Sequence, residues 1–263
     1  MNQPFAVDRT VLIRAQRATV FTFFTDSERF ASWWGAGSTN DARVGGAVRI
    51  CYPGSVVATG EVLALEPGRR IVFSYGYEGE GPPIAPGASR VTIELQDDPH
   101  GTVVALKHEV QDQATRDHHV QGWRYHLSVF AHVAGEREHM DPAAPRAPRM
   151  VDGWFAAWNE ADDGRRRATL AACCADDVTF RDPWSALQGR DELLPHIGKA
   201  LQIMPGLQLV RTGPVRHGQG TALCDWQLQQ GEQVFAAGTN VFELRPDGRI
   251  QGVVGIRAPA AER

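Results

Sequence analysis

The chain has 263 residues, of which 43% are hydrophobic and 22% are charged, and its net charge at neutral pH is −4. This length is about twice that of a typical domain, and the composition excludes the disordered, fibrous and disulfide-framework classes of protein. No apolar run approaches the roughly 20 residues of a membrane helix, and no signal-peptide pattern opens the sequence. We therefore expect a cytoplasmic protein that makes no membrane contact. The basic residues form no cluster, so we also expect no nucleic-acid partner.

The first half of the sequence opens with one strand and two short helices, followed by a run of strands. Residues 7–13 alternate between apolar and polar side chains, as a half-buried strand does. Helices are predicted over residues 19–24 and 25–34, the second with a capping-box spacing from Thr25 to Glu28. Turn-forming residues then separate five predicted strands, over residues 47–52, 56–65, 71–77, 90–95 and 102–110.

A long helix over residues 115–134 ends this half, and its apolar side chains fall on one face. A sheet curled around this helix would bury both apolar faces and leave a space between them, which is either filled by side chains or open as a ligand cavity. His119 and His126 flank the apolar stripe, whereas His118 is expected to face solvent. The candidate ligand-binding residues are Trp33, Trp34, Phe73, Tyr75, His119, Trp123, His126 and Leu127.

A series of short motifs runs in order through residues 6–135. They include Thr25-Asp26, Trp33-Trp34, Asp41-x-Arg43-x-Gly45-Gly46, Leu65-Glu66-Pro67, Leu106-x-His108 and His119-x-x-Gly122-Trp123. This ordered set resembles the family named after the activator of the heat-shock-protein ATPase, within the START-like (SRPBCC), helix-grip superfamily. The resemblance implies a helix-grip fold with an apolar pocket, and it implies no single reaction.

Residues 139–148 contain three prolines and almost no bulky apolar side chains. Such a composition is typical of an extended, semi-rigid linker. The sequence therefore predicts a first domain over residues 1–138, a proline-rich linker over 139–148 and a second domain over 149–263.

The second half predicts helices first and strands afterwards. Helical periodicity covers residues 149–161, 165–175 and 189–201, and a short strand at 177–181 lies before the last of these helices. The predicted strands that follow are residues 207–216, 221–229, 233–244 and 249–257. The whole chain is thus expected to be α+β, with a helix-grip fold followed by a cone of helices and a curved antiparallel sheet. Such a cone closes poorly at its wide end.

Asp182 is the candidate catalytic residue of this half. Phe180 and Trp184 lie two residues to either side, and an apolar setting raises the pKa of a carboxyl group toward the range of a general acid or base. The alternative is structural, because an Asp-Pro sequence at a strand end initiates turns.

Ordered motifs also run through residues 148–258. They include Trp154-x-x-x-Trp158-Asn159, Phe180-x-Asp182-Pro183, Gly189-Arg190, Trp226 and Asp247-Gly248-Arg249-Ile250. They resemble the SnoaL-like branch of the nuclear-transport-factor-two-like superfamily, whose members use pocket carboxylates or bind ligands without reaction. Relatives commonly show Gly-x-Asp where this chain has Gly238-Thr239-Asn240, and asparagine does not titrate. The candidate ligand-binding residues are Trp154, Trp158, Phe180, Trp184, Trp226 and Asn240.

These patterns favour a protein that binds a small hydrophobic molecule, because no complete acid–base pair is evident. One alternative is a cyclase, isomerase or hydrolase acting on a polyketide-like or steroid-like substrate in the second domain. Another is a co-chaperone-like ATPase activator. No metal or cofactor signature is present, and the four cysteines are expected to be reduced thiols. A homodimer is expected to form, if at all, through the sheet of the second domain.

Overall fold

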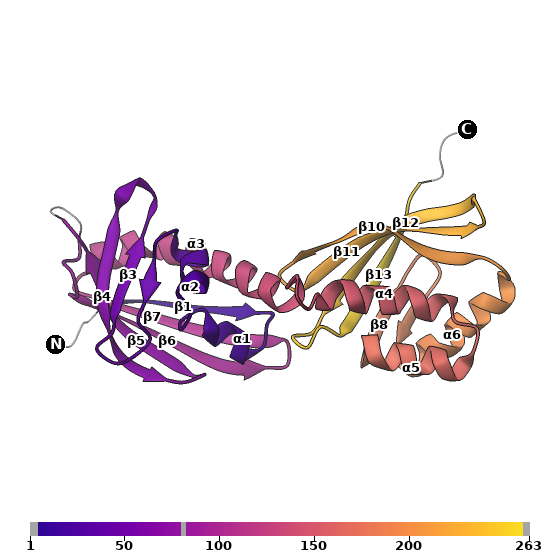
Figure 1. Cartoon of the computed structure of the whole chain (residues 1–263), viewed down its shortest axis with the longest axis horizontal. Coiled ribbons are helices and arrows are strands. Elements are labelled where there is room, and N and C mark those ends of the chain that lie inside the picture. Colours follow the sequence, from indigo (N-terminus) through magenta and orange to yellow (C-terminus); the bar gives the residue numbers. More distant parts are fainter. Residues whose placement is uncertain (1–4, 80–82, 260–263) are drawn as a thin grey trace. The chain divides into compact units, whose positions relative to one another are not determined.

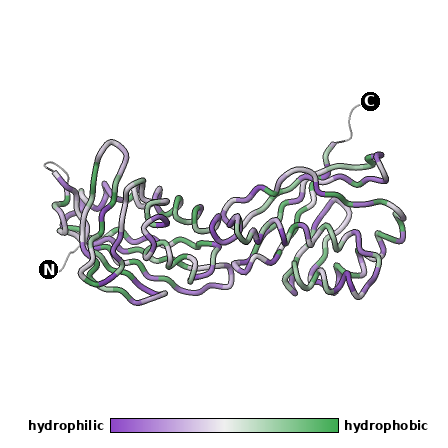
Figure 2. Tube along the Cα trace, in the orientation of Figure 1, coloured by the Kyte–Doolittle hydropathy of each residue, from purple (hydrophilic) through white to green (hydrophobic). Residues whose placement is uncertain are grey.

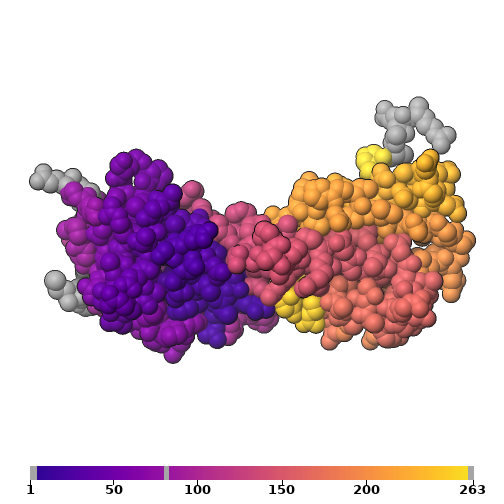
Figure 3. Space-filling model, in the orientation of Figure 1, coloured from indigo at the N-terminus to yellow at the C-terminus, as the bar shows by residue number. Residues whose placement is uncertain are grey.

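The computed structural model describes residues 5–79 and 83–259 and divides the chain into two compact units, which meet in sequence at Arg137 and Glu138. Each unit has its own hydrophobic core. Hydrophobic and hydrophilic positions are mixed along the strands of both sheets (Figure 2), as strands with one buried face require. Side chains fill most of the space that the ribbons leave open within each unit (Figure 3).

The first unit is one antiparallel sheet with two short helices and one long helix (Figure 1). The sheet order is β1-β7-β6-β5-β4-β3-β2, so sequential strands are neighbours except where β1 pairs with β7. Its elements are β1 (Phe5–Ile13), α1 (Arg17–Thr22), α2 (Ser27–Trp34), β2 (Thr39–Asn40), β3 (Ala47–Cys51), the 3₁₀ turn η1 (Pro53–Ser55), β4 (Val57–Glu66), β5 (Arg70–Tyr77), β6 (Ser89–Asp98), β7 (Gly101–Val110) and α3 (Gln113–His139).

The N-terminus of α2 shows how the local sequence sets the first unit's core. Asp26, and not Thr25 as the capping-box spacing predicts, is the N-cap, and its carboxylate accepts a hydrogen bond from the Arg29 backbone N–H at 2.9 Å. From this start the helix buries Phe30 and Trp33. The Trp33 ring stacks on Phe130 of α3 with centroids 4.7 Å apart, so α2 and α3 share one aromatic core.

The second unit contains three helices and a six-stranded sheet. Its elements are α4 (Arg146–Asn159), α5 (Asp163–Cys173), β8 (Cys174–Arg181), β9 (Ala186–Gln188), α6 (Arg190–Ile203), β10 (Gln208–Gly218), β11 (Thr221–Gln230), β12 (Gln233–Leu244) and β13 (Ile250–Arg257). The sheet order is β10-β11-β12-β13-β8-β9. The pairs are antiparallel except β13 with β8, which is parallel. The last described strand of this unit thus lies inside the sheet, beside the unit's first strand.

The α+β class and both architectures match the expectation from sequence. The parallel pair departs from the expected antiparallel sheet. Helix α4 begins at Arg146, three residues before the predicted helix, and its first turn buries Ala147. No helix within the described residues is long and apolar enough to span a bilayer.

We predict that fragments 1–137 and 138–263 each unfold cooperatively, since each has its own core. A shorter fragment, 149–263, follows the boundary expected from the proline-rich segment. It lacks the ion pair of Glu138 with Arg146 and the buried Ala147, and should be less stable than 138–263 by about 1 kcal/mol or more. Calorimetric melting of the three fragments tests this. Equal melting temperatures for 138–263 and 149–263 would contradict the assignment of residues 138–148 to the second unit.

Candidate functional site

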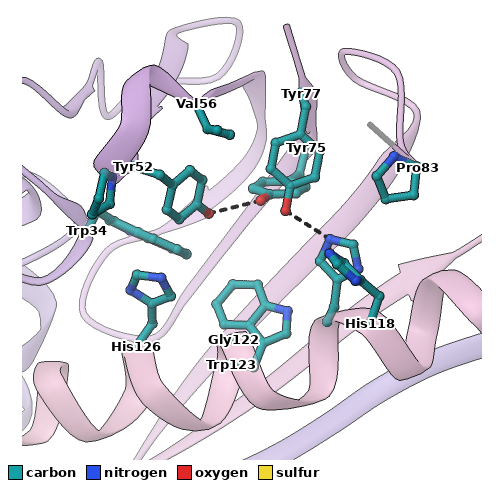
Figure 4. Close-up of a pocket in the computed structure, with 12 residues that line it drawn as sticks. Trp34, Tyr52, Val56, Tyr75, Tyr77, Pro83, His118, Gly122, Trp123 and His126 are labelled. Atoms are coloured by element: carbon teal, nitrogen blue, oxygen red, sulfur yellow. Dashed lines mark hydrogen bonds between the residues drawn. The ribbon is translucent and has the colours of Figure 1, made fainter. Parts of the chain in front are cut away.

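The first unit contains a cavity of about 310 Å³ between α3 and the strands that face it (Figure 4). Its buried wall comes from α2, β5 and α3, which contribute Trp34, Tyr75, His119 and Trp123. The exposed lining residues, which mark its opening, are Pro53, Val56, Pro83, His118 and Gly122. The half-buried residues Tyr52, Tyr77 and His126 complete the lining.

A buried histidine joins the helix to the sheet behind this cavity. His108 of β7 is 0% exposed, and its Nδ1 accepts a hydrogen bond from the Trp123 indole N–H at 3.0 Å. The Ser89 hydroxyl donates to the carbonyl oxygen of Tyr75 at 2.8 Å, so its oxygen accepts the proton on His108 Nε2, also at 2.8 Å. Both ring nitrogens are satisfied only by the neutral ring. Burial first, and His119 second, lower the pKa of His108 to about 3.

Three tyrosines, Tyr52, Tyr75 and Tyr77 (Figure 4), line the neighbouring part of the wall together with His119. His119 Nδ1 donates to the carbonyl oxygen of Thr115 at 2.7 Å, so Nε2 accepts the hydroxyl proton of Tyr77 at 3.1 Å. The hydroxyls of Tyr52 and Tyr75 are 2.9 Å apart and share a hydrogen bond. Burial raises the pKa of all three tyrosines, while it lowers that of His119, so this wall is uncharged at neutral pH.

The second unit contains a larger cavity, of about 580 Å³. Helix α4 contributes Trp154 and Trp158, and β8 contributes Phe180 near its end. Asp182 lies in the turn after β8, and Asn240 lies on β12. The rest of the lining comes from α6, from the segments after β8 and α6, and from strands β10 to β13. Many of these side chains are apolar and not aromatic, among them Leu201, Ile203, Met204, Leu207, Leu209 and Leu228. Its size lies within the range of ligand pockets, and its wall is mostly apolar.

The polar groups of this second cavity gather around the end of β8. The Asp182 carboxylate accepts the backbone N–H of Trp184 at 2.9 Å, and the Asp182 N–H donates to the Ser185 carbonyl at 3.0 Å. Asp182 thus forms the turn after β8. The Ser185 hydroxyl lies 3.4 Å from Nε2 of His196, whose ring packs on Phe180 with centroids 6.2 Å apart.

Three indole N–H groups beside this cavity have no acceptor among the residues that the structure describes. They belong to Trp154, Trp158 and Trp226. A buried donor without a partner costs free energy, so these three groups lower the free energy of unfolding of this unit. Within residues 5–79 and 83–259, no group of three His, Cys, Asp or Glu side chains could hold a metal ion.

The structure brings together most of the candidate residues of the first half. Trp34, Tyr75, His119, Trp123 and His126 line the smaller cavity, whereas Trp33, Phe73 and Leu127 lie in the core. Sequence reasoning missed Tyr52 and Tyr77. His118 is exposed, as expected, but it also lies at the cavity opening, which was not expected. Tyr77 carried a usable signal, because residues 75 and 77 of one strand face the same side.

All the candidates of the second half line the larger cavity, namely Asp182, Trp154, Trp158, Phe180, Trp184, Trp226 and Asn240. Trp184 is 69% exposed, and the guanidinium of Arg257 lies over its indole ring, 5.6 Å from the ring centroid. Trp184 therefore belongs to the outer part of the cavity. His196 and Lys199 of α6 were missed. Their three-residue spacing places them on one helix face, but polar residues at that spacing are typical of solvated faces too.

Comparisons with known proteins match each unit separately. Residues 14–135 match the family described as Activator of Hsp90 ATPase homolog 1-like protein, and residues 151–253 match the SnoaL-like domain family. Comparison with curated proteins gives no match. The N-terminal part of the chain is therefore similar to the first family, and the C-terminal part is similar to the SnoaL-like domain family.

Three solved structures illustrate the likeness. A suggested isomerase of the SnoaL-like family from Agrobacterium tumefaciens is 29% identical over 43% of this chain and 98% of its own, with a TM-score of 0.41. An AHSA1-like protein from Rhizobium etli is 30% identical over 50% of this chain and 82% of its own, with a TM-score of 0.41. The Aha1 dimer from Colwellia psychrerythraea is 16% identical over 47% of this chain and 90% of its own, with a TM-score of 0.41.

The neutral state of His108 predicts that stability falls in mild acid. Because the folded-state pKa is about 3 and the unfolded value is about 6.5, the unfolded chain binds the proton first as pH falls below 6.5. This residue should cost about 2 kcal/mol of unfolding free energy between pH 7 and pH 5. His108→Gln keeps a donor and an acceptor without titrating, so its pH dependence should be weaker by that amount. Urea unfolding at both pH values measures the difference.

The control is His100→Gln, which changes an exposed histidine in the β6–β7 turn and should keep the wild-type pH dependence. Equal pH dependence in wild type and His108→Gln would mean that His108 is not held neutral.

Proposed function

We propose that this chain, an Activator of Hsp90 ATPase homolog 1-like domain joined to a SnoaL-like domain, binds small hydrophobic molecules in its two cavities. The observation that carries the proposal is the 580 Å³ cavity of the SnoaL-like domain. Protein cores pack to crystal-like density and leave few voids larger than a water molecule. A cavity of this size with aromatic and aliphatic walls is therefore best explained by an apolar ligand.

The polar groups of the larger cavity favour binding over acid–base catalysis. One carboxylate oxygen of Asp182 already accepts a backbone N–H, which is the geometry of a turn residue. Asn240, at the position where relatives commonly carry a carboxylate, does not titrate. Both side chains lie close to Gly255, since a Cβ built there would be 3.3 Å from Asn240 Oδ1 and 3.4 Å from Asp182 Cβ. The pair therefore offers one carboxylate and one amide.

A second candidate function is catalysis by an isomerase, cyclase or hydrolase at this same site. The observation in its favour is that Ser185 lies between Asp182 and His196. Its carbonyl oxygen accepts the backbone N–H of Asp182, and its hydroxyl lies 3.4 Å from Nε2 of His196. A histidine and a carboxylate in one apolar cavity are the groups that general acid–base chemistry uses.

Dimer formation through the sheet of this domain is a separate prediction.

Filling the larger cavity should abolish binding there. Ala200 lines the cavity on α6, so Ala200→Trp places an indole inside it and should weaken binding of N-phenyl-1-naphthylamine by about tenfold or more. The fluorescence of this neutral probe rises in apolar surroundings, which allows titration of the intact chain. Gln202→Trp is the matched control, because this residue of α6 is exposed and outside the lining. Equal probe affinities in the two variants would contradict binding in this cavity.

Asp182→Asn separates the two candidate functions. Asparagine also accepts the Trp184 N–H, so a turn residue tolerates the change, and both stability and probe affinity should stay near wild type. A general acid or base would lose about 10²–10⁴ in turnover. We expect native mass spectrometry of the purified chain to identify a bound molecule. When that molecule is incubated with wild type or with Asp182→Asn, we expect to recover it unchanged in both cases. Its conversion by wild type alone would favour the enzyme.

A further inference from the structure

The smaller cavity has a wall without carboxylate, ammonium or guanidinium groups. Among its lining residues, all of which the structure describes, there is no Asp, Glu, Lys or Arg. The ionisable groups in it are tyrosines and histidines, and burial opposes the charge on each buried one, as described above. An ion that entered would lose its hydration without meeting an opposite charge. The wall therefore selects against charged ligands.

Most hydrogen-bonding atoms of this wall already have partners. The Trp123 N–H is used by His108, and the Tyr77 hydroxyl proton is used by His119. The hydroxyls of Tyr52 and Tyr75 bond to each other. These groups give the wall its shape, and a ligand gains little from them because their strongest interactions are already formed.

Two ring nitrogens are exceptions. The indole N–H of Trp34 has no acceptor among the described residues, but its nitrogen is buried, so only the second exception, on His126, is open to a ligand. Nδ1 of His126 lies 3.2 Å from the carbonyl oxygen of Trp33, and a carbonyl only accepts, so Nδ1 carries the proton. In a neutral ring the other nitrogen, Nε2, then carries a lone pair, and burial lowers the pKa of His126 and favours that neutral ring. Nε2 has no hydrogen-bond donor among the described residues, and it is not among the buried unpaired atoms, so a ligand can reach it.

The surroundings of His126 fit a flat ring. Its imidazole packs against Trp34 at 4.8 Å and Tyr52 at 5.5 Å between centroids, and it shares the cavity wall with Trp123 (Figure 4). Indole and phenol faces contact flat apolar rings over a large area. A cavity of about 310 Å³ holds a molecule of one to a few rings.

We propose that the smaller cavity takes an uncharged ring compound with a hydroxyl or N–H group, which donates a hydrogen bond to Nε2 of His126. The inference deepens the proposed function, because it requires that this cavity bind an apolar molecule. It adds a selectivity: among ligands of one shape, the hydrogen-bond donor binds best. A net hydrogen bond of ordinary strength corresponds to about a three- to tenfold preference.

Calorimetric titration of the intact chain tests the preference with two ligands that share one ring system. 2-Naphthol donates a hydrogen bond and 2-methoxynaphthalene does not, so the first should bind about three- to tenfold more tightly. All titrations use the Ala200→Trp background, in which the larger cavity is filled. In this background, His126→Phe keeps an aromatic ring and removes the acceptor, so the two ligands should bind equally.

His132→Phe is the matched control, since this exposed residue of α3 lies outside the cavity lining, and it should keep the preference. Equal binding of both ligands before any change at His126 would overturn the selectivity and leave the binding function standing. Persistence of the preference in His126→Phe would overturn the role of His126. Binding of neither ligand would overturn both the inference and the proposed function of this cavity. The first comparison needs no change at His126, so it decides even if His126→Phe does not fold.

Discussion

The first domain depends on the requirement that a fully buried imidazole satisfy both of its nitrogens. His108 meets it by accepting from an indole of α3 and donating to the hydroxyl of Ser89 on the adjacent strand β6. This arrangement fixes where α3 lies along the sheet, because sliding the helix would separate Trp123 from its acceptor. The same hydrogen bond occupies the indole N–H of Trp123, so a ligand in the cavity contacts the apolar part of the ring. One polar contact behind the wall therefore sets both the position of the helix and the character of the cavity.

The two cavities differ in the pairing and the charge of the polar groups in their walls. In the smaller one most polar groups bond to each other, although the Trp34 indole N–H has no acceptor among the described residues. The neutral forms of its buried histidines and tyrosines are favoured because burial penalises charge. In the larger one the wall is mostly hydrocarbon, three indole N–H groups remain unpaired, and the charged side chains Lys199 and Arg257 belong to the lining. The first suits a compact, uncharged molecule, whereas the second has room for a larger apolar one.

Sequence periodicity was enough to predict the α+β class, both architectures and the apolar face of α3. It could not separate core from cavity, since Trp123 and Leu127 lie on one face yet only Trp123 lines the cavity. Whether a side chain on this face lies in the core or at the cavity depends on which other side chains pack against it. For Leu127 these are side chains distant in sequence. Tyr52 was missed because it follows β3 and reaches the cavity only through the sheet's register. The parallel pairing of β8 with β13 was equally hidden, because each strand alone reads the same in either direction.

That parallel pairing bears on the order in which the second domain is built during synthesis. β13 is the last of this domain's described strands to be synthesised, yet it lies between β12 and β8 in the finished sheet. Until it emerges, β8 and β9 have no partner in the rest of the sheet, and the strand edges that will flank β13 stay open to other chains. A nascent chain stalled a few residues short would thus present two separate pieces of sheet. In the first domain β1 likewise waits for β7, but β7 and α3 complete that domain while more than a hundred residues remain to be translated.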